Sequence, residues 1–270
     1  MTQNIKYTHA INLLSRLSEQ GKNVFTIEDA RAAININKRH LDNLLQSLVE
    51  KKWLERIEKG KYLIIPLEAG PGRKWSEEAF VVASHLVDPY AISYWSALNY
   101  WHYTEQISTT VFIETTKRKT DKVILGVPFK FVFLQKRKLF GLTDIWFDNK
   151  KVQITDKEKT IIDCLDHPEH CGGIIEAAKG LFNSIEAGIN LETITDYAER
   201  LNNSAVFKRL GYLSEIFNLP VQNYANKWQE QISSGYSLLD PAGEKTGRYY
   251  SRWNLRLNVS ETALTSWRGH

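Results

Sequence analysis

Residues 37–52 carry the pattern that most constrains how this chain can fold. Apolar side chains recur there at the spacing of an α-helix and would form one stripe along its length. The stripe consists of Leu41, Leu44, Leu45, Leu48 and Val49. A helix of this kind buries its apolar face against a core and leaves the opposite face in solvent. On a helical projection, the outer face presents Arg39, Asn43 and Gln46.

The outer face has a chemistry of its own, because a helix that only needs solubility more often carries Glu and Lys there. Arg, Asn and Gln match the hydrogen-bonding edges of guanine and adenine in the major groove of DNA. A short helix and a turn over residues 34–37 precede this segment. The order predicts a helix-turn-helix in which residues 37–52 form the recognition helix.

The flanking segments agree with this interpretation. Residues 8–19 form an amphipathic pattern that ends before Gly21. Thr26 is a candidate N-cap for the short helix, and Asp29 favours its N-terminus electrostatically. Asn37 is a candidate N-cap for the recognition helix. The sequence therefore predicts three helices before residue 53.

A β-hairpin is predicted directly after the recognition helix. Residues 53–57 and 61–65 have strand-like patterns, and Gly60 between them can supply the positive φ of a tight turn. This hairpin would be the wing of a winged helix-turn-helix, with Lys59 and Lys61 near its tip in reach of phosphates. The predicted DNA-binding residues are Lys38, Arg39, His40, Asn43, Gln46, Lys59 and Lys61.

The charge of this segment permits two interpretations. Residues 37–61 hold seven Lys or Arg against four acidic residues, which is a modest excess rather than a dense basic patch. Winged helices serve in protein contact in a minority of cases, and that alternative stays open because a fold alone does not fix a function. We favour double-stranded DNA as the partner.

Length and composition set the wider frame. The chain has 270 residues, enough for about two domains, and 43% of them are hydrophobic. The net charge of +4 permits contact with nucleic acid without requiring it. With two cysteines, no signal segment and no apolar run near the ~20 residues of a membrane span, we expect a cytoplasmic protein.

Residues 66–74 contain two prolines and two glycines, so we predict a winged helix-turn-helix domain at 1–68, a linker at 69–76 and a second domain at 77–270.

The second domain shows a block of strands between blocks of helices. Helices are predicted at 77–86 and 91–101, followed by strands at 109–114, 130–134, 145–147 and 152–154. Four further helices are predicted at 156–165, 174–181, 191–201 and 205–217. This segregation predicts an α+β fold class.

Three segments of the chain resemble the AbiEi family, the antitoxins of abortive-infection toxin–antitoxin systems. They are residues 90–98 (YAISYWSAL), residues 152–163 (VQITDKEKTIID), and residues 238–241 (LLDP) with 252–255 (RWNL) and Asn258. Polar residues within them are expected to cap and fasten the fold, and Asp163 is expected at a helix surface or cap.

The resemblance implies two activities. The N-terminal domain would bind promoter repeats of its own operon and repress it. The C-terminal domain would counteract a co-encoded, nucleotidyltransferase-like toxin. The expected surface for that second activity comprises Tyr94, Trp95, Trp101, Lys117, Arg118, Lys136 and Arg137. The four basic residues lie at two strand ends that could share one edge. Solvated loops are the favoured explanation of such stretches, and the functional alternative is contact with the DNA backbone or an acidic partner.

Other chemistry has weaker support, and we expect neither an enzyme nor a cofactor. Cys164, His167, His170 and Cys171 are zinc-ligand types, but they crowd around a helix end instead of forming two separated pairs. Asp144, Asp148 and Lys150 suit a nuclease but fall at a predicted hairpin, where exposed charge is ordinary. No phosphate-binding loop or nucleophile-elbow motif occurs. The alternatives are a ligand-sensing transcription factor, whose aromatic-rich second domain would hold a small molecule, and a nuclease with a DNA-targeting domain.

Overall fold

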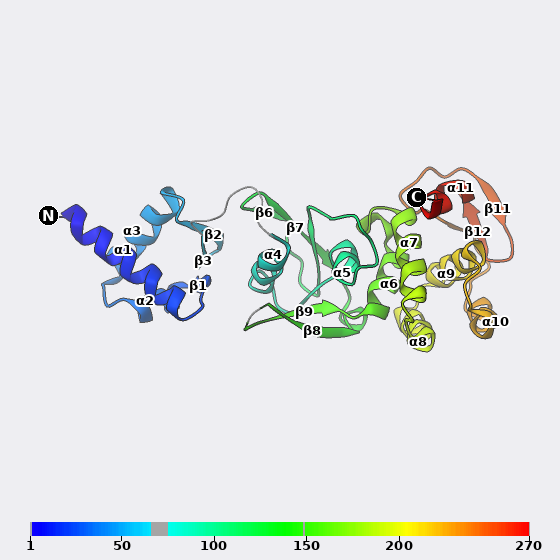
Figure 1. Ribbon diagram of the computed structural model, residues 1–270, viewed down its shortest axis with the longest axis horizontal. Coiled ribbons are helices and arrows are strands. Elements are labelled where there is room, and N and C mark those ends of the chain that lie inside the picture. The colour runs from blue at the N-terminus through cyan, green and yellow to red at the C-terminus, as the bar shows by residue number, and fades with distance from the viewer. Residues whose placement is uncertain (1, 66–74, 148, 270) are drawn as a thin grey trace. The chain divides into compact units, whose positions relative to one another are not determined.

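The computed structural model describes residues 2–65, 75–147 and 149–269 (Figure 1). The chain forms two compact units, Met1–Asp88 with Val123–Val127, and Pro89–Lys122 with Pro128–His270. The described residues form eleven α-helices and three sheets, which confirms the predicted α+β class. Most of the predicted linker lies outside the described residues. Among the helices that the structure describes, none has the length and apolar character needed to cross a bilayer.

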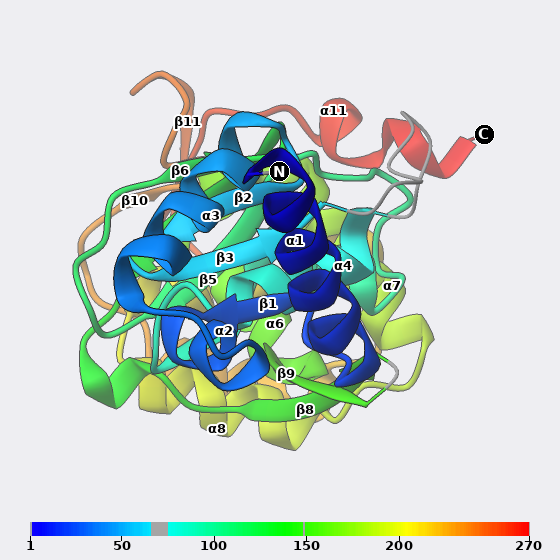
Figure 2. The same ribbon diagram turned by 90° about the vertical axis from the view of Figure 1, so that its left-hand side faces the viewer.

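The first part of the chain folds as a winged helix-turn-helix. Its helices are α1 (Thr2–Glu19), α2 (Ile27–Ala33) and α3 (Lys38–Glu50), and its strands are β1 (Val24–Thr26), β2 (Leu54–Glu58) and β3 (Lys61–Ile64). The strands form an antiparallel sheet in the order β1-β3-β2, and Figure 2 shows the three helices around it. The sequence did not predict β1, because three residues are too few to show a strand period and the pairing with β3 makes it a strand.

The predicted caps are confirmed. The Thr26 hydroxyl accepts a hydrogen bond from Asp29 N at 3.1 Å, and the Asp29 carboxylate accepts one from Thr26 N at 2.8 Å. This reciprocal capping box satisfies two backbone donors that a helix start leaves unpaired. The Asn37 side chain accepts from His40 N at 2.9 Å and starts α3 in the same way. Each cap starts its helix at the residue that the sequence predicts.

A six-stranded mixed sheet forms the centre of the second part. Its strands are β4 (Tyr90–Ile92), β5 (Val111–Thr115), β6 (Lys122–Ile124), β7 (Val127–Phe133), β8 (Leu142–Phe147) and β9 (Lys150–Thr155), in the order β6-β7-β5-β4-β9-β8. Strands β5 and β7 run parallel, as do β4 and β9, while β4–β5 and β8–β9 are antiparallel. Short helices α4 (Trp75–Ser84) and α5 (Tyr94–Tyr100) flank β4 in sequence.

One predicted helix is partly wrong. The helix expected over residues 91–101 starts only at Tyr94, because residues 90–92 form strand β4. Tyr90, Ala91 and Ile92 pair with β5, and Ile92 also pairs with Ile154 of β9. A run that is buried on every side has no amphipathic period, so its type depends on the strands beside it.

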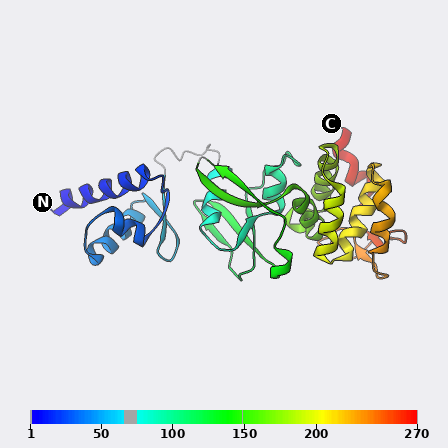
Figure 3. The ribbon, with the colours of Figure 1, turned by 90° about the horizontal axis from the view of Figure 1, so that it is seen from below.

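Helices pack beside one another next to the sheet (Figure 3). They are α6 (Lys157–Asp166), α7 (Ile174–Glu186), α8 (Leu191–Leu201), α9 (Ser204–Phe217) and α10 (Gln222–Glu230). The first four confirm predicted helices, whereas α10 was not predicted. Short 3-10 turns occur at Lys136–Lys138, Pro168–His170 and Ser266–Gly269. The core of this part lies between these helices and includes Leu165, Leu210 and Trp228, all fully buried.

The C-terminal segment closes this helical core. It contains β10 (Ser237–Leu238), β11 (Arg248–Tyr250), β12 (Leu255–Leu257) and α11 (Glu261–Thr265), with β12 at the centre of a small sheet. The Asn258 amide accepts from Asp240 N at 2.9 Å and donates to Asp240 O at 2.8 Å. The Trp253 ring is buried against α9, where a Cβ on Gly211 would lie 2.3 Å from it. The polar and aromatic residues of this ending therefore fasten the fold.

Candidate nucleic-acid interface

Helix α3 has the two faces that its sequence predicts. Leu41, Leu44, Leu45 and Leu48 are buried in a core shared with α1 and α2. Every predicted contact residue on this helix is exposed, namely Lys38, Arg39, His40, Asn43 and Gln46. The row Arg39, Asn43 and Gln46 therefore lies on a rigid helix with its polar ends in solvent. This arrangement suits a helix that enters a major groove.

The exposed face also contains acidic residues. Asp42 and Glu50 are exposed beside the predicted contact residues, and Gln46 Nε2 donates to Glu50 Oε1 at 3.0 Å. A base contact by Gln46 would replace this charge-assisted bond, which is exposed to solvent and therefore weakened. The acids keep the face from being uniformly cationic, so affinity for nucleic acid would depend on the fit of individual side chains.

The wing places its two lysines differently. Lys59 is exposed at the hairpin tip, next to Gly60, which adopts a φ of 75°. Lys61 is half-buried, and its Nζ donates to the main-chain oxygen of His85 at 2.8 Å. Both residues belong to the same compact unit. The hairpin thus presents Lys59 freely to solvent, while Lys61 is already engaged with a carbonyl.

Comparison with known proteins finds a family likeness for this segment. Residues 12–65 match the family model of the AbiEi antitoxin transcriptional regulators. The match agrees with the predicted resemblance over residues 12–65, whereas the three segments that suggested it, at 90–98, 152–163 and 238–258, lie outside the matched range. The crystal structure of the RV2827C protein from Mycobacterium tuberculosis is also similar, with a TM-score of 0.68 and 15% sequence identity over 97% of this chain and 95% of that one. At that identity the likeness shows a shared fold. No curated protein sequence matches the chain.

Outside the winged helix, the aromatic residues of the predicted surface are buried or half-buried. The prediction is wrong for Tyr94, whose side chain is 1% exposed and packs against Phe112 and His170. A residue inside the core cannot touch a partner. Trp95 and Trp101 are half-buried, and the Trp101 indole donates to Thr155 O at 3.0 Å. Their helical spacing suggested one outward face, but Trp101 bonds to strand β9 and Trp95 packs against the helical core.

The four basic residues do emerge at one edge of the sheet, which we call the basic edge (Lys117, Arg118, Lys136 and Arg137). Strands β5 and β7 are parallel and in register, with Thr115 opposite Phe133, so the loops after them start side by side. All four side chains are exposed. The Arg118 guanidinium lies 4.7 Å from the centroid of the Phe133 ring, which is 46% exposed. The basic edge is an accessible cationic surface with an aromatic component.

The sequence did not reveal a fully buried ion cluster at the centre of the second part. Lys159 is ion-paired with Asp163 one helical turn later, and its Nζ lies 3.7 Å from Glu114 Oε2. Burial opposes the charge of Lys159, but the carboxylates of Asp163 and Glu114 outweigh it and raise its pKa. Burial and the neighbouring Glu114 raise the pKa of Asp163 well above its usual value. The expectation that Asp163 lies at a helix surface or cap is therefore wrong, and the i, i+4 spacing was the available signal.

The Cys/His segment does not form a four-ligand site. Cys164 and Cys171 are free thiols inside the core. The one group with metal-ligand geometry among the described residues consists of His167, Glu169 and His170, and it leaves out both thiols. Burial, together with Lys130, lowers the pKa of His170 to about 4, so its imidazole is neutral at pH 7.

The candidate nuclease residues are arranged as an ordinary hairpin surface. Asp144 forms an ion pair of 2.7 Å with Lys151 on the neighbouring strand, and both side chains are largely exposed. Lys150 begins β9, while Asp148 lies outside the described residues. A cross-strand ion pair accounts for this spacing.

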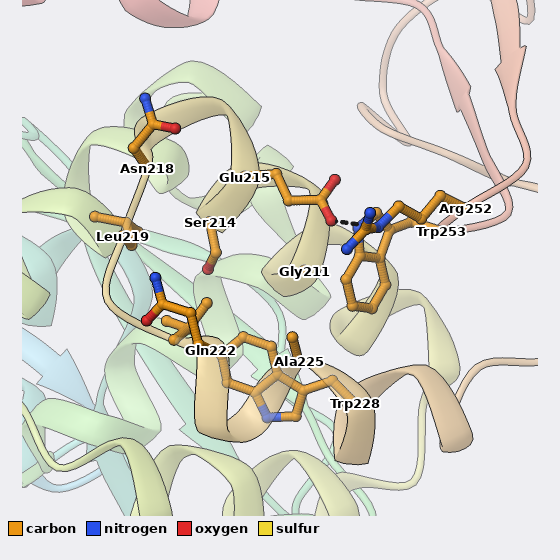
Figure 4. A pocket seen from close by; sticks show the side chains of 11 residues that line it. Gly211, Ser214, Glu215, Asn218, Leu219, Gln222, Ala225, Trp228, Arg252 and Trp253 are labelled. Carbon is orange, nitrogen blue, oxygen red and sulfur yellow. Dashed lines mark ion pairs between the residues drawn. The ribbon is translucent and has the colours of Figure 1, made fainter.

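A cavity of about 350 Å³ bears on the ligand-sensing alternative (Figure 4). It lies beside α9 and α10, and the indoles of Trp228 and Trp253 form part of its wall. Both indoles are fully buried, and Arg252 Nε is ion-paired with Glu215 Oε1 at 2.6 Å. The volume suits a small molecule. Its wall also includes the polar side chains of Ser214, Asn218 and Gln222, so the ligand-sensing alternative stays a prediction.

Proposed function

We propose that this protein is a DNA-binding repressor of its own operon and an antitoxin against a co-encoded, nucleotidyltransferase-like toxin. The observation that supports DNA binding is the exposed row of Arg39, Asn43 and Gln46 on α3, opposite a fully packed leucine face. Side chains of these types on a rigid helix read base edges, while lysines around them contact phosphates. The AbiEi match over residues 12–65 supports a regulatory role.

Replacing Arg39 with Ala should weaken operator binding by about 1–3 kcal/mol, which is roughly 5- to 150-fold in Kd. The reason is that Arg39 is exposed and would pair bidentately with one guanine. A gel shift on the promoter DNA of the chain's own gene measures the effect. Binding should also become more tolerant of substitutions at one base pair.

The control for Arg39→Ala is Lys245→Ala, which removes one exposed positive charge from the C-terminal segment. It should leave operator affinity nearly unchanged. If Arg39→Ala binds both operator and random DNA as tightly as Lys245→Ala does, α3 is not a recognition helix.

Replacing Lys59 with Ala should weaken specific and non-specific binding together. Lys59 is exposed at the wing tip, where a phosphate contact would release counterions from DNA. The slope of log K against log salt concentration should flatten by about 0.9 for one lost contact. Lys61→Ala should change it less, because that ammonium already bonds to His85 O. An unchanged slope for Lys59→Ala would exclude the wing tip from the interface.

The antitoxin activity is proposed for the second part of the chain, with the basic edge and the exposed portions of Trp95 and Trp101 as its surface. Four exposed cations favour an acidic partner face. The full-length variant Arg39→Ala/Asn43→Ala/Gln46→Ala, expressed from an unrelated promoter, should lose operator binding and still rescue cells from the toxin.

The complementary variant replaces the four residues of the basic edge with Ala. It should keep operator binding in the gel shift and rescue growth less well, because the proposed docking charge is gone. Growth during co-expression with the neighbouring toxin gene measures both variants. If the triple variant loses rescue while the basic-edge variant keeps it, toxin control depends on DNA binding alone.

A further inference from the structure

The turn between α6 and α7 gathers three metal-ligand side chains. His167, Glu169 and His170 each offer one ligand atom, and these atoms lie within 4.8 Å of one another. Two imidazole nitrogens and a carboxylate oxygen at this separation can converge on a single ion with little movement. Neither the winged helix nor the basic edge uses these residues.

The backbone of this turn is held in place without any ion. Pro168 opens a 3-10 turn and restricts its own φ. His170 N donates to His167 O at 3.0 Å, and Cys171 N and Gly173 N donate to Pro168 O at 2.8 and 2.9 Å. A ligand set on a preorganised backbone loses little conformational freedom on binding, which favours affinity.

The two imidazole rings also lie close together in nearly parallel planes. Their planes are within 22° of parallel, with centroids 5.7 Å apart. The His170 ring is fixed by Tyr94 and Phe112, at centroid distances of 5.0 and 5.8 Å. His170 Nδ1 is buried and has no hydrogen-bond partner in the protein, which is uncommon for a buried nitrogen. The His170 ring is thus ordered and leaves one nitrogen without a protein partner.

A further carboxylate, Asp166, lies near the cluster but beyond hydrogen-bond distance of it. Asp166 Oδ2 lies 3.6 Å from His167 Nε2, while His167 Nδ1 lies 2.9 Å from Glu169 Oε1. Asp166 is itself positioned by Asn203 Nδ2 at 2.5 Å and Lys138 Nζ at 3.2 Å. Metal-binding histidines commonly donate their second N–H to a carboxylate, so His167 would have to move slightly toward Asp166 to gain that bond. The His167 and Glu169 side chains are 38% and 36% exposed, so an ion can reach them.

We propose that His167, Glu169 and His170 bind one zinc ion, with water in the remaining position. Imidazole nitrogen with a single carboxylate suits Zn²⁺, whereas Mg²⁺ and Ca²⁺ prefer shells of oxygen ligands. Three protein ligands leave a tetrahedral ion one open position. The bound ion would fix the 3-10 turn that follows α6. The proposal is independent of DNA binding and of toxin control.

Isothermal titration of the full-length, tag-free chain with ZnCl₂ tests the site, with MgCl₂ as the second arm. We expect one high-affinity zinc site and no magnesium binding. Glu169→Gln should weaken zinc binding by at least 10- to 100-fold, since it removes a ligand where even outer-shell losses cost that much. His167→Asn should do the same. His102→Ala, which removes an exposed histidine elsewhere, should bind zinc as the unchanged chain does.

A second readout protects the test against misfolding. Thermal unfolding without metal shows whether each variant folds, and added zinc should raise the melting temperature of the unchanged chain and of His102→Ala only. If His170→Ala fails to fold, Glu169→Gln decides, because its side chain is partly exposed. The proposal is overturned if the unchanged chain binds no zinc below millimolar concentration. It is equally overturned if Glu169→Gln and His167→Asn bind zinc as well as His102→Ala.

Discussion

Replacing Lys159 with Met should lower the free energy of unfolding by about 3–5 kcal/mol. Lys159 is completely buried between the carboxylates of Asp163 and Glu114, which are also buried. Removing the ammonium leaves those carboxylates without a compensating charge in a medium that solvates them poorly. Urea unfolding at pH 7 measures the loss.

Lys157→Met is the matched control, because Lys157 is on the same helix and exposed. It should change the free energy of unfolding by no more than about 0.5 kcal/mol. Adding Asp163→Leu to Lys159→Met should recover part of the loss, since it deletes one of the stranded carboxylates. Equal free energies of unfolding for Lys157→Met and Lys159→Met would show that the ion pairs of Lys159 with Asp163 and Glu114 do not stabilise the fold.

The defect of Lys159→Met should shrink as the pH falls. Burial already raises the pKa of Asp163 above its unfolded value, and loss of Lys159 raises it further. A carboxyl whose pKa is higher in the folded state binds protons more tightly there. Its favourable contribution is therefore fully present below the unfolded pKa and is lost as the pH rises through the folded pKa. Unfolding curves at pH 5 and pH 7 should differ more for the variant than for the unchanged chain.

Arg209→Ala is expected to have the second-largest effect, a loss of at least about 3 kcal/mol in unfolding free energy. The buried Arg209 guanidinium donates to four main-chain oxygens, those of Leu165, Asp166, Leu238 and Leu239, at 2.6 to 3.4 Å. Each buried acceptor left unpaired costs roughly 1–3 kcal/mol. This one side chain joins the end of α6 to β10, so its loss should also release the C-terminal segment.

Arg209→Lys should recover only part of that stability, because an ammonium cannot reproduce the planar fork of donors. The control is Arg248→Ala, which breaks an exposed ion pair of 2.9 Å with Glu261 and should cost at most about 1 kcal/mol. Thermal unfolding gives the global effect, and hydrogen exchange of residues 237–257 gives the local one. Arg209 does not hold the C-terminal segment in place if Arg209→Ala is no less stable than Arg248→Ala and hydrogen exchange of residues 237–257 is unchanged.

The winged helix could be predicted closely because its signals are local. Caps at Thr26 and Asn37, the leucine stripe of α3 and the glycine of the hairpin act within a few residues of where they stand. The outward row of α3 follows from helical geometry alone. In contrast, β1 required its pairing with β3, which no short pattern could reveal.

The sequence by itself determined the elements that have one buried and one exposed face, because their apolar and polar residues alternate with a regular period. These elements are α3, the wing and helices α6 to α9. Only the tertiary structure decided the conformation and the neighbours of segments that are buried on all sides. It made residues 90–92 a strand, buried Tyr94 and Asp163, and brought Lys159 to Glu114 across 45 positions of the chain. It also placed the two halves of the basic edge together, through parallel pairing of β5 and β7. The physical reason is that a local pattern records contact with solvent, whereas the identity of a buried neighbour depends on chain topology.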